Sequence, residues 1–325
     1  AEFTFGREAK AKYNEPDAPE KADRKTMGMS CLFEIRETDS EKKYIKPEWA
    51  YTFKTDDELP MFSHNMSSNF WYIELGGEQD GIADTEQLRH ELLKIAFGVW
   101  DHFKNQGDHG MANWELDWIG FLPGKRESRR YIGDYVVVEQ DVQSSGRFDD
   151  IVAYGGWTID NHDPAGFFHK GGRQDVHSHA ESPWGIPYRA LYSKNIKNLW
   201  FAGRNISVSH LAMSSSRVMA TCALLGQAVG TAAAVALRDG VLPRYADVKE
   251  IQRILMNDDC FLPYCKRQIS ALTMKAKASH EKLRNGIERT AEGLCVLKRG
   301  EKAVYEFENA EHIKSVRLVF DSDLN

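Results

Sequence analysis

The chain has 325 residues, with 42 Lys and Arg against 48 Asp and Glu, and a net charge of -6. This length accommodates two domains, and the acidic balance excludes the basic surface that nucleic-acid binding requires. Five cysteines without a CxxC pair indicate neither a zinc site nor a disulfide framework, and the near pair Cys260 and Cys265 is interpreted as two thiols. The first residues do not form a signal peptide, so the compartment stays open.

The first half of the chain predicts one clear surface helix among strands. A short helix is expected at 6–15, and strands at 30–36 and 69–75. Residues 84–106 form the helix, because apolar residues recur on one face: Leu88, Leu92, Ile95, Val99 and Phe103. Asp84 and Gln87 make a capping pair, and Gly107 ends the helix. The helix is assigned a structural role.

The second half alternates buried strands with helices. Short apolar runs predict strands at 135–138 and 151–154, and residues 246–283 are expected to be helical in part. Residues 300–307 and 313–320 alternate in polarity like two β-strands. Two strands are too few for a stable sheet domain, so they are interpreted as the opening of a β-sandwich.

Residues 198–237 are the most informative segment. A short buried strand ends at Gly203, and an uncharged helix of small residues follows at 218–237, with Gly226 and Gly230 one turn apart. Its length also fits a membrane span, but its alanines and its polar residues Thr221, Gln227 and Thr231 favour a core helix packed closely on a sheet. Strand, glycine turn and helix N-terminus form a platform for a dinucleotide or flavin. From spacing alone, a purely structural helix is preferred, since such a glycine pattern is a weak signal.

The segment 123–130, Pro-Gly-Lys-Arg-Glu-Ser-Arg-Arg, concentrates positive charge. In a helix, Arg126 and Arg130 would share a face; in an extended chain, Arg129 and Arg130 would point to opposite sides. Guanidinium groups bind planar anions with two hydrogen bonds each. The competing interpretation is a solvated charged turn.

Histidines beside carboxylates form two further candidate sites. His162, with Asp160 or Asp163, gives a base with an orienting carboxylate, although a turn capped by the two aspartates is an equal alternative. His177 and His179 have the spacing of two metal ligands on a strand. No further ligand stands at a convincing spacing, so a surface loop is preferred and no metal site is predicted.

Three of these motifs together resemble one family. The Ala-Gly-Arg strand end with its Ser/His loop and Arg-Val-Met helix, the Gly-Lys-Arg-Glu-Ser-Arg-Arg run, and the Gly-Gly…Asp-x-His-Asp run are similar to FAD-dependent oxidoreductases related to fumarate reductases. The resemblance implies an FAD cofactor and reverses the preference for a structural helix. It implies cofactor contacts from one set of residues: Ala202, Gly203, Arg204, Asn205, Ser209, Arg217, Val218 and Met219. It implies catalytic or substrate-anchoring roles for another: His162, His210, Arg126, Arg129 and Arg130, with Glu127 as an ion-pair partner.

The resemblance also implies a domain layout. The fold class is α/β: part of a flavin-binding Rossmann-like domain, an inserted mixed-sheet substrate domain and the start of a β-sandwich. No GxGxxG follows an early strand, so the chain is expected to begin inside the cofactor domain and, alone, to bind FAD weakly. The expected boundaries are a cofactor-domain remnant, a substrate domain, a return to the cofactor domain, a helical linker and the sandwich, at 1–27, 28–150, 151–245, 246–283 and 284–325.

Three functions compete. The first is an FAD-dependent oxidoreductase that transfers a hydride between flavin and a small anionic or polyhydroxylated substrate, with no nucleic acid partner and no membrane span. The second is a non-catalytic carbohydrate- or surface-binding protein, suggested by eight Trp and twelve Tyr. The third, a metal hydrolase using His177 and His179, has the least support.

Overall fold

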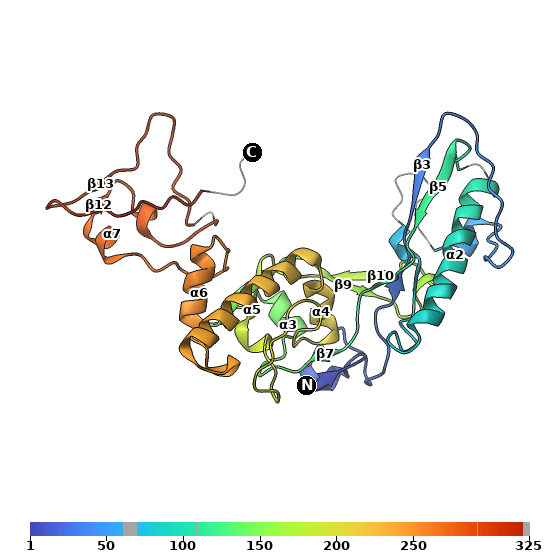
Figure 1. Ribbon diagram of the computed structural model, residues 1–325, viewed down its shortest axis with the longest axis horizontal. Coiled ribbons are helices and arrows are strands. Elements are labelled where there is room, and N and C mark those ends of the chain that lie inside the picture. The colour runs from blue at the N-terminus through green and yellow to red at the C-terminus, as the bar shows by residue number, and fades with distance from the viewer. Residues whose placement is uncertain (61–69, 108, 291, 321–325) are drawn as a thin grey trace.

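The computed structural model describes residues 1–60, 70–107, 109–290 and 292–320. Figure 1 shows three parts in a row: a lobe around α2 at one end, a central platform around α4 and α5, and a C-terminal segment at the other end. The described strands are short, and every ladder between them is antiparallel. The fold is mixed α/β, as expected, although the Rossmann-like arrangement of parallel strands stays a prediction.

The α2 lobe consists of a long helix over two small sheets. Helix α2 (Thr85–Asn105) confirms the helix predicted at 84–106, and its buried face carries the predicted apolar residues. It packs against β4 (Glu74–Leu75) and β5 (Trp114–Ile119). Strand β5 pairs with β3 (Phe33–Glu37), and a second sheet has the order β4-β2-β6, with β2 at Met29–Ser30 and β6 at Gly124–Lys125.

Two local predictions in this lobe are wrong. Most of the strand predicted at 69–75 is the 3₁₀ helix η2 (Phe70–Tyr72), and only β4 is extended; residue 69 lies outside the described residues. Asp84 occupies the N-cap of α2, but its carboxylate accepts from the Asp80 amide at 3.2 Å rather than capping the helix. A second 3₁₀ helix, η1 (Asp56–Glu58), lies near the C-terminal end of α2.

The central platform is built from paired ribbons and short helices. Its ladders pair β1 (Phe3–Thr4) with β7 (Arg130–Tyr131), β8 (Ile151–Gly155) with β11 (Trp184–Pro187), and β9 (Ile159–His162) with β10 (Asp175–Ser178). The short helices are α1 (Lys10–Tyr13), α3 (Glu139–Gln143), η3 (Gly166–Phe168), η4 (Tyr188–Ala190) and α4 (His210–Ser216). The strand predicted at 135–138 reduces to a single parallel bridge between Val137 and Val208.

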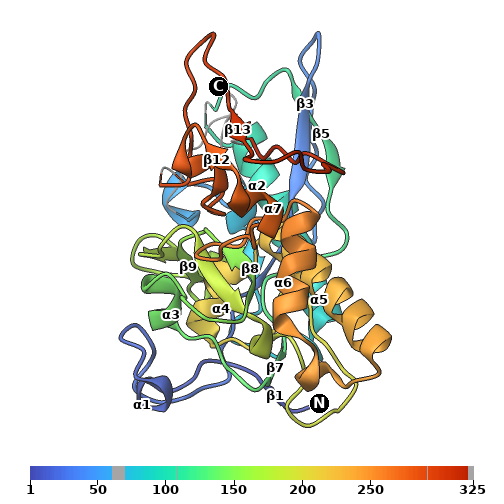
Figure 2. The same cartoon turned by 90° about the vertical axis from the view of Figure 1, so that its left-hand side faces the viewer.

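Helix α5 (Met219–Asp239) confirms the helix predicted at 218–237, but packs with only one face. Leu225, Ala228 and Ala232 are buried against β8 and α6, whereas Gly226 and Gly230 face open space among the described residues. The expected close packing at these glycines is therefore not present here. By length and composition alone α5 could cross a membrane, with mean hydropathy 1.6. Figure 2 shows α5 and α6 running beside each other.

The C-terminal segment departs most from its sequence pattern. It contains η5 (Pro243–Tyr245), α6 (Val248–Asn257), α7 (Ala271–Lys275) and η6 (Glu281–Arg284). The two strands predicted at 300–307 and 313–320 do not pair with each other. Instead β13 (Tyr305–Glu306) pairs with β12 (Lys277–Ala278), and 313–320 is exposed and not a strand. All five cysteines, each within the described residues, are free thiols.

Candidate functional site

Side chains of strand β9 and of the arginine-rich segment at 123–130 contribute to two buried polar clusters. Because side chains alternate along an extended strand, Asp160 and His162 leave β9 on one side and Asn161 leaves on the other. In the arginine-rich segment, the side chain of Arg126 belongs to one cluster and that of the next residue, Glu127, belongs to the other. We name the clusters by their central residues. The Asp160 cluster contains Asp160, His162, Glu74, Arg126 and Arg217, and the Arg130 cluster contains Arg130, Glu127, Glu8, His210 and Asn161.

The Arg130 cluster is enclosed on all sides. The Arg130 guanidinium donates to the Val208 carbonyl at 3.1 Å, to the Gly6 carbonyl at 2.6 Å and to Glu8 Oε1 at 2.8 Å, and also to Glu127. These acceptors come from three separate segments of the chain, at residues 6–8, 127 and 208. Arg130 therefore ties the N-terminal segment to the loop before α4.

His210 completes the Arg130 cluster. Its Nδ1 lies 2.9 Å from Glu127 Oε2, its Nε2 lies 3.0 Å from Asn161 Oδ1, and its backbone amide donates to Glu8 Oε2 at 3.0 Å. Burial alone would raise the pKa of Glu8, but the charge and hydrogen bonds of Arg130 and His210 lower it. Both nitrogens of His210 thus have partners within the protein, and the predicted role of His210 in proton transfer stays a prediction.

The Asp160 cluster is partly open to solvent. His162 Nδ1 lies 2.7 Å from Glu74 Oε2 and its Nε2 lies 3.2 Å from Asp160 Oδ1. Arg126 pairs with Glu74 Oε2 at 3.2 Å, and Arg217 pairs with Asp160 Oδ2 at 3.1 Å. The half-exposed Trp157 and His177 border Asp160, with Trp157 Nε1 at 3.5 Å from Oδ2. Asp160 thus contacts both His162 and Arg217. It lies beside a solvent-facing rim that is formed by Trp157 and His177.

The charges of this cluster stabilise the protonated form of His162. Burial alone would lower its pKa, but the hydrogen bonds to Asp160 and Glu74 raise it. Carboxylates only accept hydrogen bonds, so a ring with one on each nitrogen is held as the imidazolium. Burial would raise the pKa of Asp160, yet His162 and Arg217 lower it to about 2. Asp160 is therefore ionised near neutral pH, and the raised pKa of His162 favours its protonated form.

The beginning of α5 fits the FAD assignment. Val218 stands at the N-cap without a capping side chain, Met219 and Ala220 are exposed, and the first turn lacks an acidic residue. Such a terminus presents backbone NH groups and a partial positive charge to an anion. Gly203, at φ 93°, leaves open space where a side chain would stand among the described residues. Arg217 Nε is buried and has no hydrogen-bond partner in the described part of the chain. These features suit a flavin or phosphate edge.

Several predicted site residues lie outside both clusters. Arg129 is exposed, with its guanidinium 5.1 Å from the centre of the Phe3 ring. Ser209 is fully buried: its hydroxyl donates to Glu15 and accepts from the Ala212 amide, capping α4. Ala202, Arg204 and Asn205 lie at the surface or half-buried near Gly203.

The contacts of Asp163 show which of the two aspartates, Asp160 or Asp163, accompanies His162. It lies 3.3 Å from His169 and accepts from the Ala165 amide at 2.9 Å, so it stabilises a turn. Asp160, not Asp163, therefore orients His162. His177 lies on β10 rather than in the expected loop, and the exposed His179 lies 3.4 Å from Glu181.

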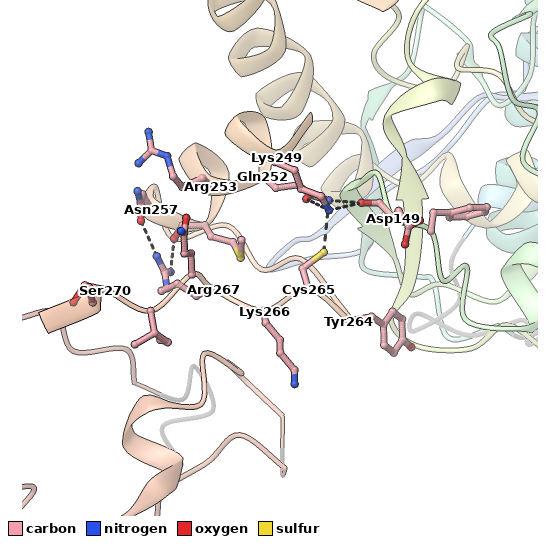
Figure 3. Close-up of a pocket in the computed structure, with 15 residues that line it drawn as sticks. Asp149, Lys249, Gln252, Arg253, Asn257, Tyr264, Cys265, Lys266, Arg267 and Ser270 are labelled. Carbon is pink, nitrogen blue, oxygen red and sulfur yellow. Dashed lines mark hydrogen bonds between the residues drawn. The ribbon is translucent and has the colours of Figure 1, made fainter. Parts of the chain in front are cut away.

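A cavity of about 550 Å³ lies apart from these residues, between α6 and the segment 264–271 (Figure 3). Three of its basic side chains already have partners: Arg253 pairs with Glu250, Arg267 with Glu288, and Lys249 donates to the Asp149 carbonyl at 3.1 Å. No residue of either cluster lines it.

A family model described as FAD dependent oxidoreductase matches residues 1–255. The match covers the α2 lobe, both clusters and α5, and it ends within α6. The chain therefore belongs to the FAD-dependent oxidoreductases, and it is an FAD-dependent enzyme. No curated protein and no solved structure matches the chain.

The sequence did not single out Glu74 and Glu8. Each stands in a segment without a recognisable motif, and each is buried because the chain brings it to a distant arginine. Glu74 follows the aromatic run 70–72, where a carboxylate in an otherwise apolar stretch was the one available signal. A buried acid of this kind requires a cation nearby.

Proposed function

We propose that the Asp160 cluster is the proton-transfer and anion-binding part of a site in which a hydride passes between a small organic substrate and FAD. The observation that best supports this proposal is the series of contacts from His162 through Asp160 to Arg217. Arg217 directly precedes α5, so the acid–base group and the predicted flavin platform are connected by one carboxylate. The finer relation to fumarate reductases is part of this proposal.

Bound FAD supplies two-electron chemistry, and the chain supplies charge and a proton. The cluster sets two carboxyl groups, those of Glu74 and Asp160, against the guanidinium groups of Arg126 and Arg217 and the imidazole of His162, whose pKa is raised. An excess positive charge beside a solvent-facing rim favours an anionic substrate and stabilises negative charge that develops during reduction. Trp157 offers an exposed aromatic face at the same rim.

The protonation of His162 favours one direction of reaction. An imidazolium is ready to donate its Nε2 proton to a substrate that accepts a hydride. Oxidation of a substrate would require His162 to lose that proton first. We therefore infer that substrate reduction dominates near neutral pH, and that oxidation gains as the pH rises through the raised pKa of His162.

The test uses the FAD-loaded protein under anaerobic conditions. Flavin absorbance is followed while small carboxylates and polyols are added to the oxidised enzyme, or unsaturated acids and ketones to the dithionite-reduced enzyme. His162→Gln is expected to slow the responsive reaction by about 100-fold or more, the usual contribution of a positioned acid or base. His179→Gln, an exposed histidine on the next ribbon, is the matched control.

Measuring the flavin content of each protein shows whether a changed rate reflects loss of FAD or loss of the acid–base group. Equal flavin content and equal rates in wild-type and His162→Gln proteins would remove His162 from the proposal. A response confined to neutral compounds would contradict the anionic substrate class while leaving the enzyme class intact.

A further inference from the structure

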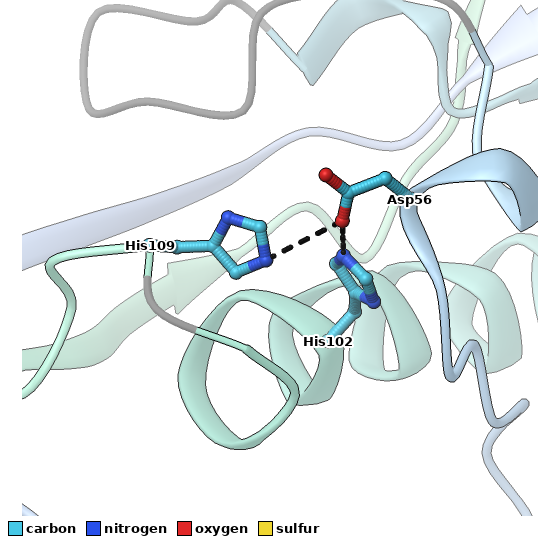
Figure 4. Close-up of side chains that lie close together, drawn as sticks. All are labelled: Asp56, His102 and His109. Atoms are coloured by element: carbon cyan, nitrogen blue, oxygen red, sulfur yellow. Dashed lines mark hydrogen bonds and ion pairs between the residues drawn. The ribbon is translucent and has the colours of Figure 1, made fainter.

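The α2 lobe contains a second group of chemically active side chains, which the flavin chemistry does not use. Asp56 lies in η1, His102 lies in the last turn of α2, and His109 follows the turn at Gly107 (Figure 4). We propose that these three side chains bind a divalent first-row transition metal ion.

The distances between the donor atoms suit such an ion. His102 Nε2 lies 3.0 Å and His109 Nε2 lies 3.7 Å from the same oxygen, Asp56 Oδ1, and all three atoms lie within 4.8 Å of one another. Ligands bonded at 2.0–2.1 Å in a tetrahedral zinc site are separated by about 3.3 Å. The two distances to Asp56 lie on either side of that value. Closing the site requires the longer contact, between His109 Nε2 and Asp56 Oδ1, to shorten by a few tenths of an ångström, and the exposed Asp56 side chain can supply this shift.

The outer contact of His102 supplies an independent argument. Its Nδ1 lies 3.0 Å from the Phe53 carbonyl, which can only accept a hydrogen bond, so Nδ1 carries the hydrogen. In a neutral ring, Nε2 then presents a lone pair to the Asp56 carboxylate. Two acceptors 3.0 Å apart repel each other unless a cation lies between them. An imidazole whose far nitrogen donates to a backbone carbonyl is the usual arrangement of a metal-ligating histidine.

The burial of the two imidazoles increases the need for a cation between His102 and Asp56. The side chain of His102 is 1% exposed and that of His109 is 9% exposed, whereas Asp56 is 64% exposed. The two imidazoles are therefore held in a low-dielectric pocket that an ion can enter from the side of Asp56. Aromatic packing of both rings against Phe103, at 5.8 and 5.2 Å between ring centres, fixes their positions.

A second group with similar donors shows why this one is preferred. Asp160, Asp175 and His177 also lie within 4.8 Å of one another. There, Arg217 pairs with Asp160 and Arg173 pairs with Asp175 at 2.7 Å. Guanidinium groups already neutralise these carboxylates, so an added dication would meet positive charge. At Asp56, the Nε2 atoms of His102 and His109 lie 3.0 and 3.7 Å from the same carboxylate oxygen, so the donor atoms themselves meet there.

The donor set defines the class of metal. Two imidazoles and a carboxylate suit Zn²⁺, Fe²⁺, Co²⁺ or Ni²⁺, whereas Mg²⁺ and Ca²⁺ prefer oxygen ligands alone. The ion would connect η1 to the end of α2 and so stabilise the lobe. This site is independent of FAD, and its test does not require the flavin reaction.

The experiment uses untagged protein that has been treated with a chelator and then dialysed against Zn²⁺ or Co²⁺. We expect one Zn²⁺ per chain by elemental analysis, visible absorption bands of bound Co²⁺, and a higher melting temperature with metal. Asp56→Asn and His109→Gln are expected to weaken Zn²⁺ binding by at least about 100-fold, since loss of even an outer contact costs about 10–100-fold. Because the His109 ring packs against His102 and Phe103 of α2, the folding of both variants is checked by circular dichroism.

His177→Gln is the matched control, because it removes the histidine of the other group. Retained Zn²⁺ binding in His177→Gln and its loss in Asp56→Asn support the proposal. Unchanged Zn²⁺ affinity in the double variant of Asp56→Asn and His109→Gln would overturn it. Wild-type protein that binds no Zn²⁺ at micromolar concentration would overturn it as well.

Discussion

The Arg130 and Asp160 clusters draw on the same two segments of chain but differ in what surrounds them. Arg130 is fully buried and every one of its nitrogens faces an acceptor, whereas Asp160 and Arg217 border exposed side chains. A saturated cluster can connect segments but has no hydrogen-bonding capacity left for a ligand. A buried donor that lacks a partner among the described residues, such as Arg217 Nε, leaves that capacity available. Both clusters contain arginine, histidine and acidic residues, so residue type alone does not distinguish a structural cluster from a ligand-binding one. The distinction lies in whether every hydrogen-bonding atom already has a partner.

The largest effect is expected at Arg130. Arg130→Leu would leave Glu8 and Glu127 buried without their cation, a change that costs about 3–5 kcal/mol of unfolding free energy. Denaturant unfolding of the flavin-free protein measures this loss. A decrease no larger than that of an exposed substitution such as Lys21→Ala would show that the cluster does not hold the platform together.

Asp160→Asn distinguishes the two clusters by activity. The change removes the negative charge shared by His162 and Arg217, so the pKa of His162 should fall. A fall of one unit reduces the protonated fraction by up to about tenfold, and the full factor is reached only at a pH above both the old and the new pKa. We expect reduction of the substrate to slow most at the high end of the pH range, with its pH profile displaced to lower pH. A slower rate with an unchanged pH profile would indicate a structural role for Asp160 only.

Local patterns predicted some of this arrangement, and long-range contacts account for the rest. The helix at 84–106 was predictable because its apolar period persists over five turns, and α5 because its small residues form an uninterrupted helical run. The arginine-rich segment and the 160–162 run were singled out by their similarity to family motifs, and the structure brings residues of both into polar clusters. Their division between two clusters was not, because it depends on Glu8 and Glu74, which approach from distant segments.

The C-terminal segment illustrates a different limit. Alternating polarity at 313–320 describes a strand that needs a partner and a buried face. In the structure its side chains are exposed, so the pattern has no sheet to which it can contribute. The metal ligands of the α2 lobe show the same dependence on context, since Asp56 and His102 are 46 residues apart in sequence.

The raised pKa of His162 predicts a smaller effect, on stability. A group whose pKa is higher in the folded than in the unfolded protein stabilises the fold fully below the unfolded value, about 6.5. That contribution is lost as the pH rises through the folded value. The unfolding free energy of the wild type should therefore decrease above about pH 6.5 more steeply than that of His162→Gln. Parallel pH dependences in the two proteins would show that Asp160 and Glu74 do not hold the proton on His162.

Arg129→Ala is expected to have the smallest effect, although the sequence pattern gave Arg129 the same standing as its neighbours. Its exposed guanidinium lies over Phe3, and contacts of this kind contribute less than about 1 kcal/mol at the surface. Flavin reduction should be unchanged, because Arg129 belongs to neither cluster. A large loss of activity in Arg129→Ala, with normal flavin content, would mean that substrate approaches from the side of Phe3 and β1. The Asp160 cluster would then serve the fold, and the distinction drawn from saturation would fail.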